Sequence, residues 1–202
     1  MQSSSITTDF IFAWYTRLEY LESSWTQRID TWLYWNLNKK FILDSKRSST
    51  LSYWLVFGAN SSWWEQLYVR DQNRIFLNWS IVYWVSAPSS NVRHIIEWNT
   101  TSWNASIKLD WTVVASNSWT NTNNKKLTLF WTYETSNAQT PTWYKTKIYS
   151  FKWYDVSNNE LVREMCPVRR KSDNVLWMLD TVNKVFYTNS WSWTFIAWPD
   201  IN

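Results

Sequence analysis

The segment at residues 75–84 of this chain, IFLNWSIVYW, has the pattern of a β-hairpin but lacks the residue that a tight hairpin needs. Two short runs of apolar, β-branched and aromatic residues flank Asn78, Trp79 and Ser80. A two-residue loop of type I′ requires positive φ at both central residues, so the expected dipeptide is Asn-Gly. A bulky side chain makes positive φ costly. The segment therefore predicts a turn at Asn78-Trp79 with tryptophan in the place of glycine.

Tryptophan takes the place of glycine along the whole chain. The 202 residues include 20 tryptophans and one glycine, Gly58, whereas average usage would give about 14 glycines. Asp110-Trp111 separates two strand-like runs, where Asp-Gly is the usual turn. Core tryptophans would follow the apolar phase of a strand. Other tryptophans instead accompany Ser-, Thr- and Asn-rich stretches that read as turns: Trp63, Trp64, Trp98, Trp103, Trp119, Trp191 and Trp193.

This distribution suggests a difference in decoding. The codon UGA is read as tryptophan in some genetic codes and as glycine in others. A gene that uses UGA for glycine, translated with a table that reads UGA as tryptophan, would give this pattern, and its tryptophan codons would be overwhelmingly UGA. The alternative is a chain that is naturally rich in tryptophan, with indole rings serving as platforms on which sugars stack.

The rest of the chain predicts an all-β fold, because strand-like runs recur about every 8–12 residues with turn signals between them. No segment has a sustained helical period with caps, and only a short helical turn near 135–140 is expected. Many antiparallel strands in one domain favour two packed sheets. The expected strands are 17–21, 40–44, 51–58, 65–70, 74–77, 80–83, 91–97, 105–109, 112–115, 125–130, 145–154, 160–165, 174–179 and 184–187.

Length and charge indicate one domain without a nucleic-acid footprint. Residues 1–15 are expected to form a tail or linker, and residues 16–202 one domain. The formal net charge is +4 and is spread along the chain. The one basic cluster, Arg169-Arg170-Lys171, is too small for a nucleic-acid stripe. We expect synthesis in the cytoplasm and no membrane insertion, because neither a signal peptide nor an apolar stretch of about 20 residues is present.

Cysteine and histidine are too few for several kinds of site. Cys166 is the only cysteine and His94 the only histidine, which excludes an intrachain disulfide and argues against zinc sites and Cys-His catalysis. We expect Cys166 to be a small buried thiol and His94 a strand residue.

When tryptophan is read as glycine, two stretches resemble the signatures of a known domain family. Residues 15–32, YTRLEYLESSWTQRIDTW, and residues 166–201, CPVRRKSDNVLWMLDTVNKVFYTNSWSWTFIAWPDI, then resemble the opening and closing signatures of a laminin-G-like, concanavalin A-like jelly-roll domain. Such domains occur in phage tail-fibre and minor structural proteins and in related bacterial surface proteins. The segment KIYSFKWYDVSNNELVREMCPV resembles the strand pair that leads into the closing signature. The resemblance spans about residues 15–201, and the family has glycine at Trp25, Trp32, Trp177, Trp191, Trp193 and Trp198.

The resemblance implies a sandwich of two curved antiparallel sheets with the N- and C-terminal segments adjacent. Relatives of this shape bind glycans on the concave face or on the loops at one edge, sometimes with calcium. We therefore expect a non-enzymatic module of a phage tail or surface protein that contacts host-surface carbohydrate, located in the virion or on an extracellular surface. Weak sites would act together in a homo-oligomeric fibre. A glycan-cleaving enzyme of the same fold and a purely architectural domain remain as alternatives.

Carboxylates offer the enzymatic alternative little support. The closest acid pairs are Glu19 with Glu22 and Glu160 with Glu164. A glycoside hydrolase needs carboxyl groups about 5–9.5 Å apart across a cleft, whereas four strand residues span about 13 Å. We expect no catalytic residue.

Calcium is the one cofactor that remains open, but no calcium-binding loop motif is present. Asp110, Asp155, Asp173 and Asp180 lie in or near expected turns, and we expect each to bond the backbone there. The candidates for sugar contact are loops 117–124 and 134–140, because function concentrates on loops. Strand tyrosines are also available, although packing explains them more simply: Tyr53, Tyr68, Tyr83, Tyr133, Tyr144 and Tyr149.

Overall fold

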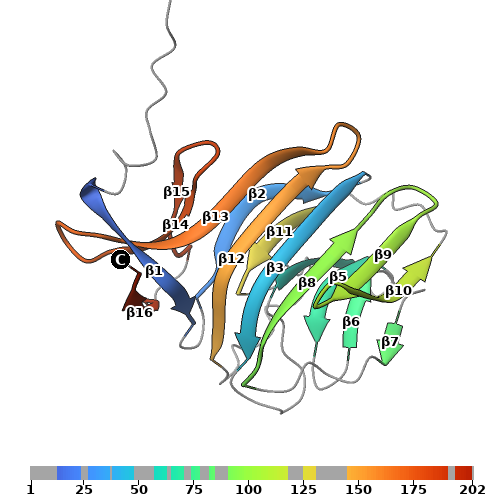
Figure 1. The fold of residues 1–202 in the computed structure, drawn as a ribbon, viewed down its shortest axis with the longest axis horizontal. Coiled ribbons are helices and arrows are strands. Elements are labelled where there is room, and N and C mark those ends of the chain that lie inside the picture. Colours follow the sequence, from blue (N-terminus) through green and yellow to red (C-terminus); the bar gives the residue numbers. More distant parts are fainter. Residues whose placement is uncertain are drawn as a thin grey trace, which may run out of the picture.

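The computed structural model is an all-β sandwich of two antiparallel sheets (Figure 1). It describes residues 13–23, 27–36, 38–47, 57–62, 65–70, 74–77, 82–84, 91–117, 125–130, 145–190 and 194–201. No helix occurs among the elements of these ranges. The strands are β1 (Tyr15–Glu22), β2 (Ile29–Trp35), β3 (Lys39–Arg47), β4 (Phe57–Ser62), β5 (Glu65–Arg70), β6 (Arg74–Leu77), β7 (Val82–Trp84), β8 (Arg93–Asn99), β9 (Ala105–Leu109), β10 (Thr112–Asn117), β11 (Lys125–Leu129), β12 (Thr146–Asp155), β13 (Glu160–Arg170), β14 (Leu176–Asp180), β15 (Val185–Tyr187) and β16 (Ile196–Asp200).

The larger sheet has ten strands and contains both ends of the described chain. Its order is β10-β9-β8-β3-β12-β1-β13-β14-β15, and β16 pairs with β1. The last strand lies antiparallel to the first, with Leu18 opposite Asp200 and Glu22 opposite Ile196. The N- and C-terminal segments are therefore adjacent, as the resemblance implies.

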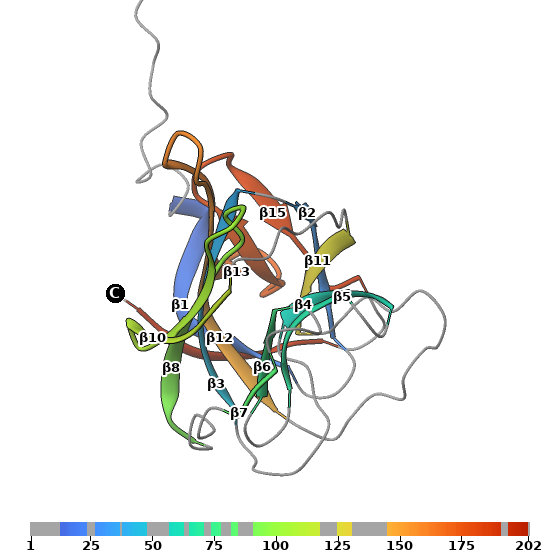
Figure 2. The ribbon, with the colours of Figure 1, turned by 90° about the vertical axis from the view of Figure 1, so that its right-hand side faces the viewer.

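The smaller sheet has six strands in the order β2-β11-β4-β5-β6-β7. The turned view in Figure 2 separates it from the strands β1, β3, β8 and β12 of the larger sheet. Alternate side chains of each strand point to opposite faces, so each sheet presents one apolar face to the other. The main core draws on the larger sheet through residues such as Phe41, Trp98 and Phe151, and on the smaller sheet through Ile29 and Leu129.

The expected strands correspond closely to the observed ones. Three agree at both ends, namely β5, β6 and β9, and most others differ by a few residues. β4 is an exception, because it begins at Phe57, near the end of the expected strand 51–58. Two strands were not expected at all, β2 and β16. The expected helical turn near 135–140 lies outside the described residues.

The two expected hairpins differ in outcome. β9 and β10 pair with Leu109 opposite Thr112, so Asp110-Trp111 is the predicted two-residue loop. β6 and β7 also pair, but the register sets Phe76 opposite Val82. That register leaves an odd number of residues between the paired positions, so the prediction of a two-residue turn at Asn78-Trp79 is wrong. The hairpin itself is present.

Candidate functional site

Three connections meet at one end of the larger sheet and form a polar surface. They are the β2–β3 connection at Asn36 and Asn38, the β8–β9 connection (100–104) and the β12–β13 turn (156–159); we call them the three-loop end. Backbone bonds join them, because Asn38 N donates to Thr100 O at 3.2 Å and Val156 N donates to Asn38 O at 2.8 Å. The surface is therefore fixed by main-chain contacts between segments far apart in sequence.

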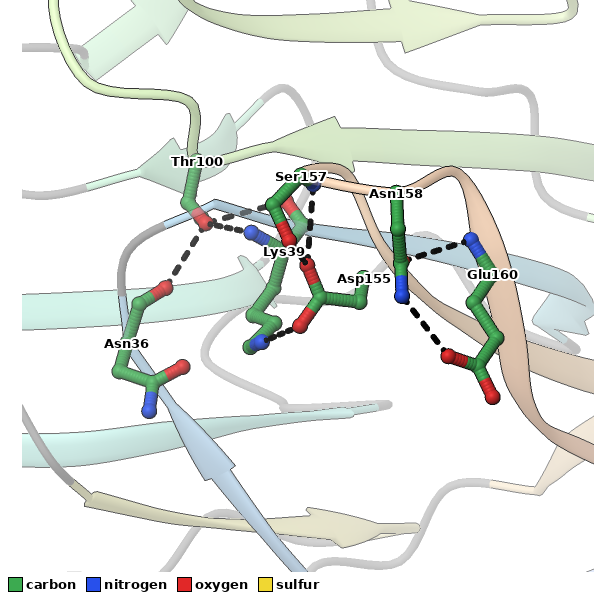
Figure 3. Close-up of polar contacts among 7 residues, drawn as sticks. All are labelled: Asn36, Lys39, Thr100, Asp155, Ser157, Asn158 and Glu160. Atoms are coloured by element: carbon green, nitrogen blue, oxygen red, sulfur yellow. Dashed lines mark hydrogen bonds and ion pairs between the residues drawn. The ribbon is translucent and has the colours of Figure 1, made fainter.

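Thr100 is the central residue of this arrangement (Figure 3). Its side chain is 2% exposed. Its hydroxyl donates to Asn36 O at 2.8 Å and accepts from Lys39 N at 3.0 Å. A buried hydroxyl with both roles satisfied holds the β2–β3 connection against the β8–β9 connection.

An ion pair fixes the third loop. Lys39 Nζ contacts Asp155 Oδ2, and Asp155 Oδ1 accepts from Ser157 N at 2.9 Å (Figure 3). The Lys39 ammonium, followed by the hydroxyl and N–H of Ser157, lowers the pKa of the Asp155 carboxyl to about 2. Asp155 is therefore ionised throughout the neutral range and acts as a fixed acceptor for the turn.

Amides and hydroxyls lie on the outer side of the three-loop end, beside the exposed ring of Trp103. Asn38, Asn104, Ser157 and Asn158 are exposed. Asn36 Oδ1 has no hydrogen-bond partner among the described residues, although water reaches little of this atom. Planar amides and hydroxyls of this kind, held by a rigid scaffold, suit the hydrogen-bonding pattern of sugar hydroxyls. Sequence reasoning missed this surface because its residues come from three separate loops.

Three described tryptophans have backbones in the left-handed region that favours glycine. Their φ angles are 59° at Trp32, 61° at Trp103 and 70° at Trp111. Their side chains are 63%, 74% and 61% exposed, so burial does not compensate for the backbone. Trp103 belongs to the three-loop end. The backbone at these three positions has the left-handed conformation that glycine adopts at the least cost.

Trp32 shows the local cause in most detail. It lies in β2 where the register against β11 shifts between Lys126 and Thr128, which marks a β-bulge. A bulge residue in the left-handed conformation is usually glycine. The indole ring points outward and lies 4.6 Å beneath Lys126 Nζ, while Thr31 Oγ1 donates to Leu127 O at 2.7 Å.

The expectation that Trp98 belongs to a turn is wrong. Trp98 lies in β8, has no exposed surface and packs in the main core. It faces Phe41 and Ile107 in the register of the neighbouring strands. The polar residues that follow it begin only after the strand ends. The remaining turn candidates lie outside the described residues: Trp63, Trp64, Trp79, Trp119, Trp191 and Trp193. Trp25, a glycine position of the resembled family, also lies outside them.

The four aspartates singled out for turns all bond the backbone. Asp155, Asp173 and Asp180 each accept from the N–H two residues later, at 2.9, 3.2 and 3.0 Å. Asp110 instead accepts from Ile95 N across the sheet at 2.9 Å. They belong to separate turns and do not converge on one point. Within the described ranges, no three His, Cys, Asp or Glu side chains gather as metal ligands.

One member of each acid pair, Glu22 or Glu164, forms an ion pair with a lysine of the sheet. Glu22 is buried 3.7 Å from Lys147 Nζ, and Glu19 lies on the same strand β1. Glu160 accepts from Asn158 Nδ2 at 2.8 Å, and Glu164 lies 2.9 Å from Lys152 Nζ. A register shift between Trp153 and Tyr154 interrupts the simple alternation that would align the two glutamates. Burial raises the pKa of Glu164, but the Lys152 contacts outweigh it and the pKa is lowered, which keeps this carboxyl ionised.

Cys166 and His94 have the predicted roles. Cys166 is 4% exposed, and burial raises the pKa of its thiol to about 11. His94 lies in β8, where its Nδ1 is 2.7 Å from Asp110 Oδ2. Burial acts to raise the pKa of the Asp110 carboxyl, but the contacts with the Ile95 N–H and with His94 outweigh burial, and the pKa is lowered. The strands of Cys166 and His94, β13 and β8, are not neighbours in the sheet.

Only one of the tyrosine candidates has a described side chain. Tyr149 packs at 5.2 Å against Tyr20, and the Arg93 guanidinium covers its ring at 3.9 Å. Its ring therefore takes part in cross-strand packing. Tyr68 and Tyr83 lie on β5 and β7, and their side chains are not described. The candidate loops 117–124 and 134–140 lie outside the described residues, apart from Asn117, the last residue of β10. The candidates outside the described residues are Tyr53, Tyr133 and Tyr144.

Comparison with known proteins gives no match to a family model, to a curated protein or to a solved structure. Among the described residues, no helix has the length and apolar character needed to cross a membrane.

Proposed function

We propose that the chain is a non-enzymatic carbohydrate-binding or adhesion module of a phage tail or phage-derived surface protein. In this proposal the natural protein carries glycine at most of the positions printed as tryptophan. It acts in the virion or on an extracellular surface, as part of a homo-oligomeric fibre or particle. Host-surface glycan is its partner.

The left-handed backbone at Trp32, Trp103 and Trp111 is the observation that carries the proposal. The resemblance to laminin-G-like, concanavalin A-like domains depends on reading tryptophan as glycine. These three backbones support that reading without using the resemblance, because φ near 60° is a glycine preference for any fold. The two-sheet architecture and the pairing of β1 with β16 agree with the family that the resemblance names.

The three-loop end supplies the contact surface in this proposal. Its exposed amides and hydroxyls offer donors and acceptors without net charge, and its backbone is held by bonds between the loops. We expect such a polar surface to bind one sugar weakly. Several copies in a fibre would raise the overall affinity by effective concentration, with no new contact.

A glycan array probed with the glycine-decoded protein tests the function. Binding without product release is the expected result. Release of a shortened glycan would replace the proposal with a hydrolase of the same fold, and absence of binding to every glycan would favour an architectural domain. Tail or lysis genes beside the coding gene are expected from the phage assignment.

A variant of the three-loop end tests whether this surface contacts the sugar. Asn104→Ala removes an exposed amide of the three-loop end, and we expect reduced glycan binding with an unchanged melting temperature. Thr188→Ala, an exposed change near β15, is the matched control and should bind as the parent does. Equal binding by both variants would place the sugar elsewhere on the domain.

A further inference from the structure

The larger sheet ends on a strand that has no neighbour on its outer side among the described residues. β10 pairs with β9 only, and it lies at the end of the sheet in Figure 1. Thr112, Val113 and Ser116 are exposed on it, with 56% of Val113 open to solvent. An edge strand of this kind presents a row of backbone N–H and C=O groups that can pair with another strand.

β10 lacks most of the features that prevent edge strands from pairing. Short length, charged side chains and proline are common features of this kind, and a β-bulge is another. β10 has six residues, TVVASN, with neither a charge nor a proline. Its one protective feature is a register shift between Val113 and Ala115, after which regular pairing with β9 resumes from Ala115 to Asn117. The edge beyond the shift is therefore suited to a partner strand.

The other edge strands of the described sheets carry such protection. β7 and β15 have only three residues each. β16 contains Pro199 and Asp200, and Asp200 forms an ion pair with Arg169 at 2.6 Å. β2 contains Asp30. Among the described edge strands, only β10 combines a length of more than three residues with the absence of charge and proline.

A second copy of the same edge is the partner that fits β10. A two-fold axis would set β10 antiparallel to β10 of the other copy, so that each copy supplies the strand that the other lacks. Because β10 carries no charge, every register of this pairing sets neutral side chains opposite neutral ones. The nearest charges are already engaged within one copy: Lys108 pairs with Glu97 at 2.7 Å, and Asp110 accepts from Ile95 N at 2.9 Å.

We propose that β10 pairs antiparallel with β10 of a second copy, so that the larger sheet continues through a two-fold dimer interface. Main-chain hydrogen bonds between the two strands hold the interface, as in other cases of strand addition to a sheet edge. The inference rests on the homo-oligomeric state in the proposed function and names the surface that forms it. It uses the strand and not the indole of Trp111, so it applies equally to a chain with glycine at that position.

Sedimentation of the chain over a range of concentrations tests the interface. We expect a dimer to form between about 1 μM and 1 mM. Val113→Lys and Ser116→Lys should each weaken it at least about tenfold, because like charges of the two copies then lie close together across the axis. Val185→Lys is the matched control, since Val185 is also exposed, at 43%, on an edge strand of the larger sheet. The control should associate as the parent does, and melting temperatures show that each variant keeps the fold.

Amide hydrogen exchange locates the interface without any substitution. Backbone N–H groups of β10 should exchange more slowly at a concentration where the dimer is populated than in dilute solution, because pairing across the axis protects them. The amides of β15, at the other end of the sheet, should exchange at the same rate in both samples. Concentration-dependent protection of β15 in place of β10 would assign the dimer to the opposite edge.

The outcomes separate this inference from the glycan-binding proposal. A parent that stays monomeric overturns the interface and leaves the edge for a strand of another protein, and a dimer that both lysine variants leave unchanged also overturns it. A dimer that is lost in Trp111→Gly overturns it as well, because the exposed indole would then hold the copies together. A dimer with the expected properties that binds no glycan keeps the interface and overturns the carbohydrate-binding function, whereas a monomer that binds glycans does the reverse.

Discussion

Asp110 and Trp111 are the two central residues of the β9–β10 hairpin, and both have positive φ, 46° and 70°. This combination is the signature of a type I′ turn, whose twist matches that of the flanking strands. Asp110 tolerates the conformation and fixes it, because its carboxylate accepts from Ile95 N and contacts His94 Nδ1. Trp111 gains nothing comparable, since its ring is 61% exposed.

Replacing Trp111 by glycine is therefore expected to stabilise the printed chain. The left-handed conformation destabilises a residue with a side chain by about 1–2 kcal/mol, and glycine removes this strain. Glycine also gives the unfolded chain more conformational freedom, which offsets part of the stabilisation. We expect a net rise of about 1 kcal/mol in the free energy of unfolding, measured by urea denaturation. Trp153→Gly, in the interior of β12, is the control and should lower it. A destabilised Trp111→Gly variant would mean that the indole contributes contacts that outweigh its backbone.

Local turn chemistry and strand composition were enough to predict most of the fold. The turn at Asp110-Trp111 could be predicted because two strand-like runs separated by two residues are typical of a tight β-hairpin. β2 was missed because its outward residues Trp32 and Tyr34 are aromatic, which hides in the sequence the alternation of the buried residues Ile29, Thr31 and Leu33. β16 was missed because it is short and its stability comes from pairing with β1, at the other end of the sequence.

The polar surfaces could not be predicted in the same way. Thr100 acquires its role from Asn36 and Lys39, which are more than 60 residues away in sequence. Asparagine and threonine in a loop indicate only a turn; their meeting with two other loops follows from sheet order. Trp98 was misplaced for a related reason, because the polar residues after it masked the fact that it continues the core-facing phase of β8.

Removal of the Asp180 carboxylate should strongly destabilise the domain. Asp180 has no exposed surface, lies 3.3 Å from Arg163 Nη1 and accepts from Val182 N and Asn183 N at 3.0 and 3.2 Å. Asp180→Ala leaves a charge and two N–H groups without their acceptor, so we expect a loss of about 3 kcal/mol in the free energy of unfolding.

The matched controls for Asp180 separate charge from turn geometry. Asp180→Asn keeps an acceptor for the turn and should cost less than the alanine variant. Asp173→Ala removes a comparable but exposed turn carboxylate and should cost least. An Asp180→Ala protein as stable as Asp173→Ala would show that the buried network does not hold the β14–β15 turn.

The Lys39–Asp155 pair predicts a defined loss of stability in acid. The pKa of the Asp155 carboxyl in the folded state is about 2, below the value of about 3.9 expected for an aspartate in an unfolded chain. A lowered carboxyl pKa contributes stability that is fully present above about pH 4 and is lost as the pH falls toward 2. Because both side chains are partly exposed, the contribution should be about 1 kcal/mol or less.

Asp155→Asn isolates this contribution, since asparagine can still bond Ser157 N. We expect the variant to melt below the parent at pH 7 and to melt with it at pH 2. The double variant with Lys39→Gln should show no further loss from the second change. A difference in melting temperature that persists unchanged at pH 2 would assign the effect to the turn instead of the ion pair.

Cys166 should be unreactive until the domain unfolds. Burial raises the pKa of its thiol to about 11, so at pH 7.5 the native protein contains far less thiolate than an unfolded chain, and the sulfur is also inaccessible. We expect modification by a soluble disulfide reagent to be slower by on the order of 100-fold in the native protein than in urea. The raised pKa also predicts stability that is complete below about pH 8.5 and is lost as the pH rises toward 11. Rapid modification of the native protein would place Cys166 at the surface.

Four of the described tryptophans fall into two groups by backbone and burial, and we expect their codons to fall into the same two groups. Trp32, Trp103 and Trp111 combine a left-handed backbone with an exposed ring, so we expect UGA codons that the natural host reads as glycine. Trp98 is fully buried among Phe41, Ile107 and the rest of the main core. Glycine there would leave a cavity costing about 4 kcal/mol or more, so we expect UGG at codon 98. Sequencing of the gene, with mass spectrometry of peptides from the natural source, checks both groups. UGG at the three left-handed positions would end the decoding hypothesis, and UGA at codon 98 would mean that the natural domain packs its core differently from the printed chain.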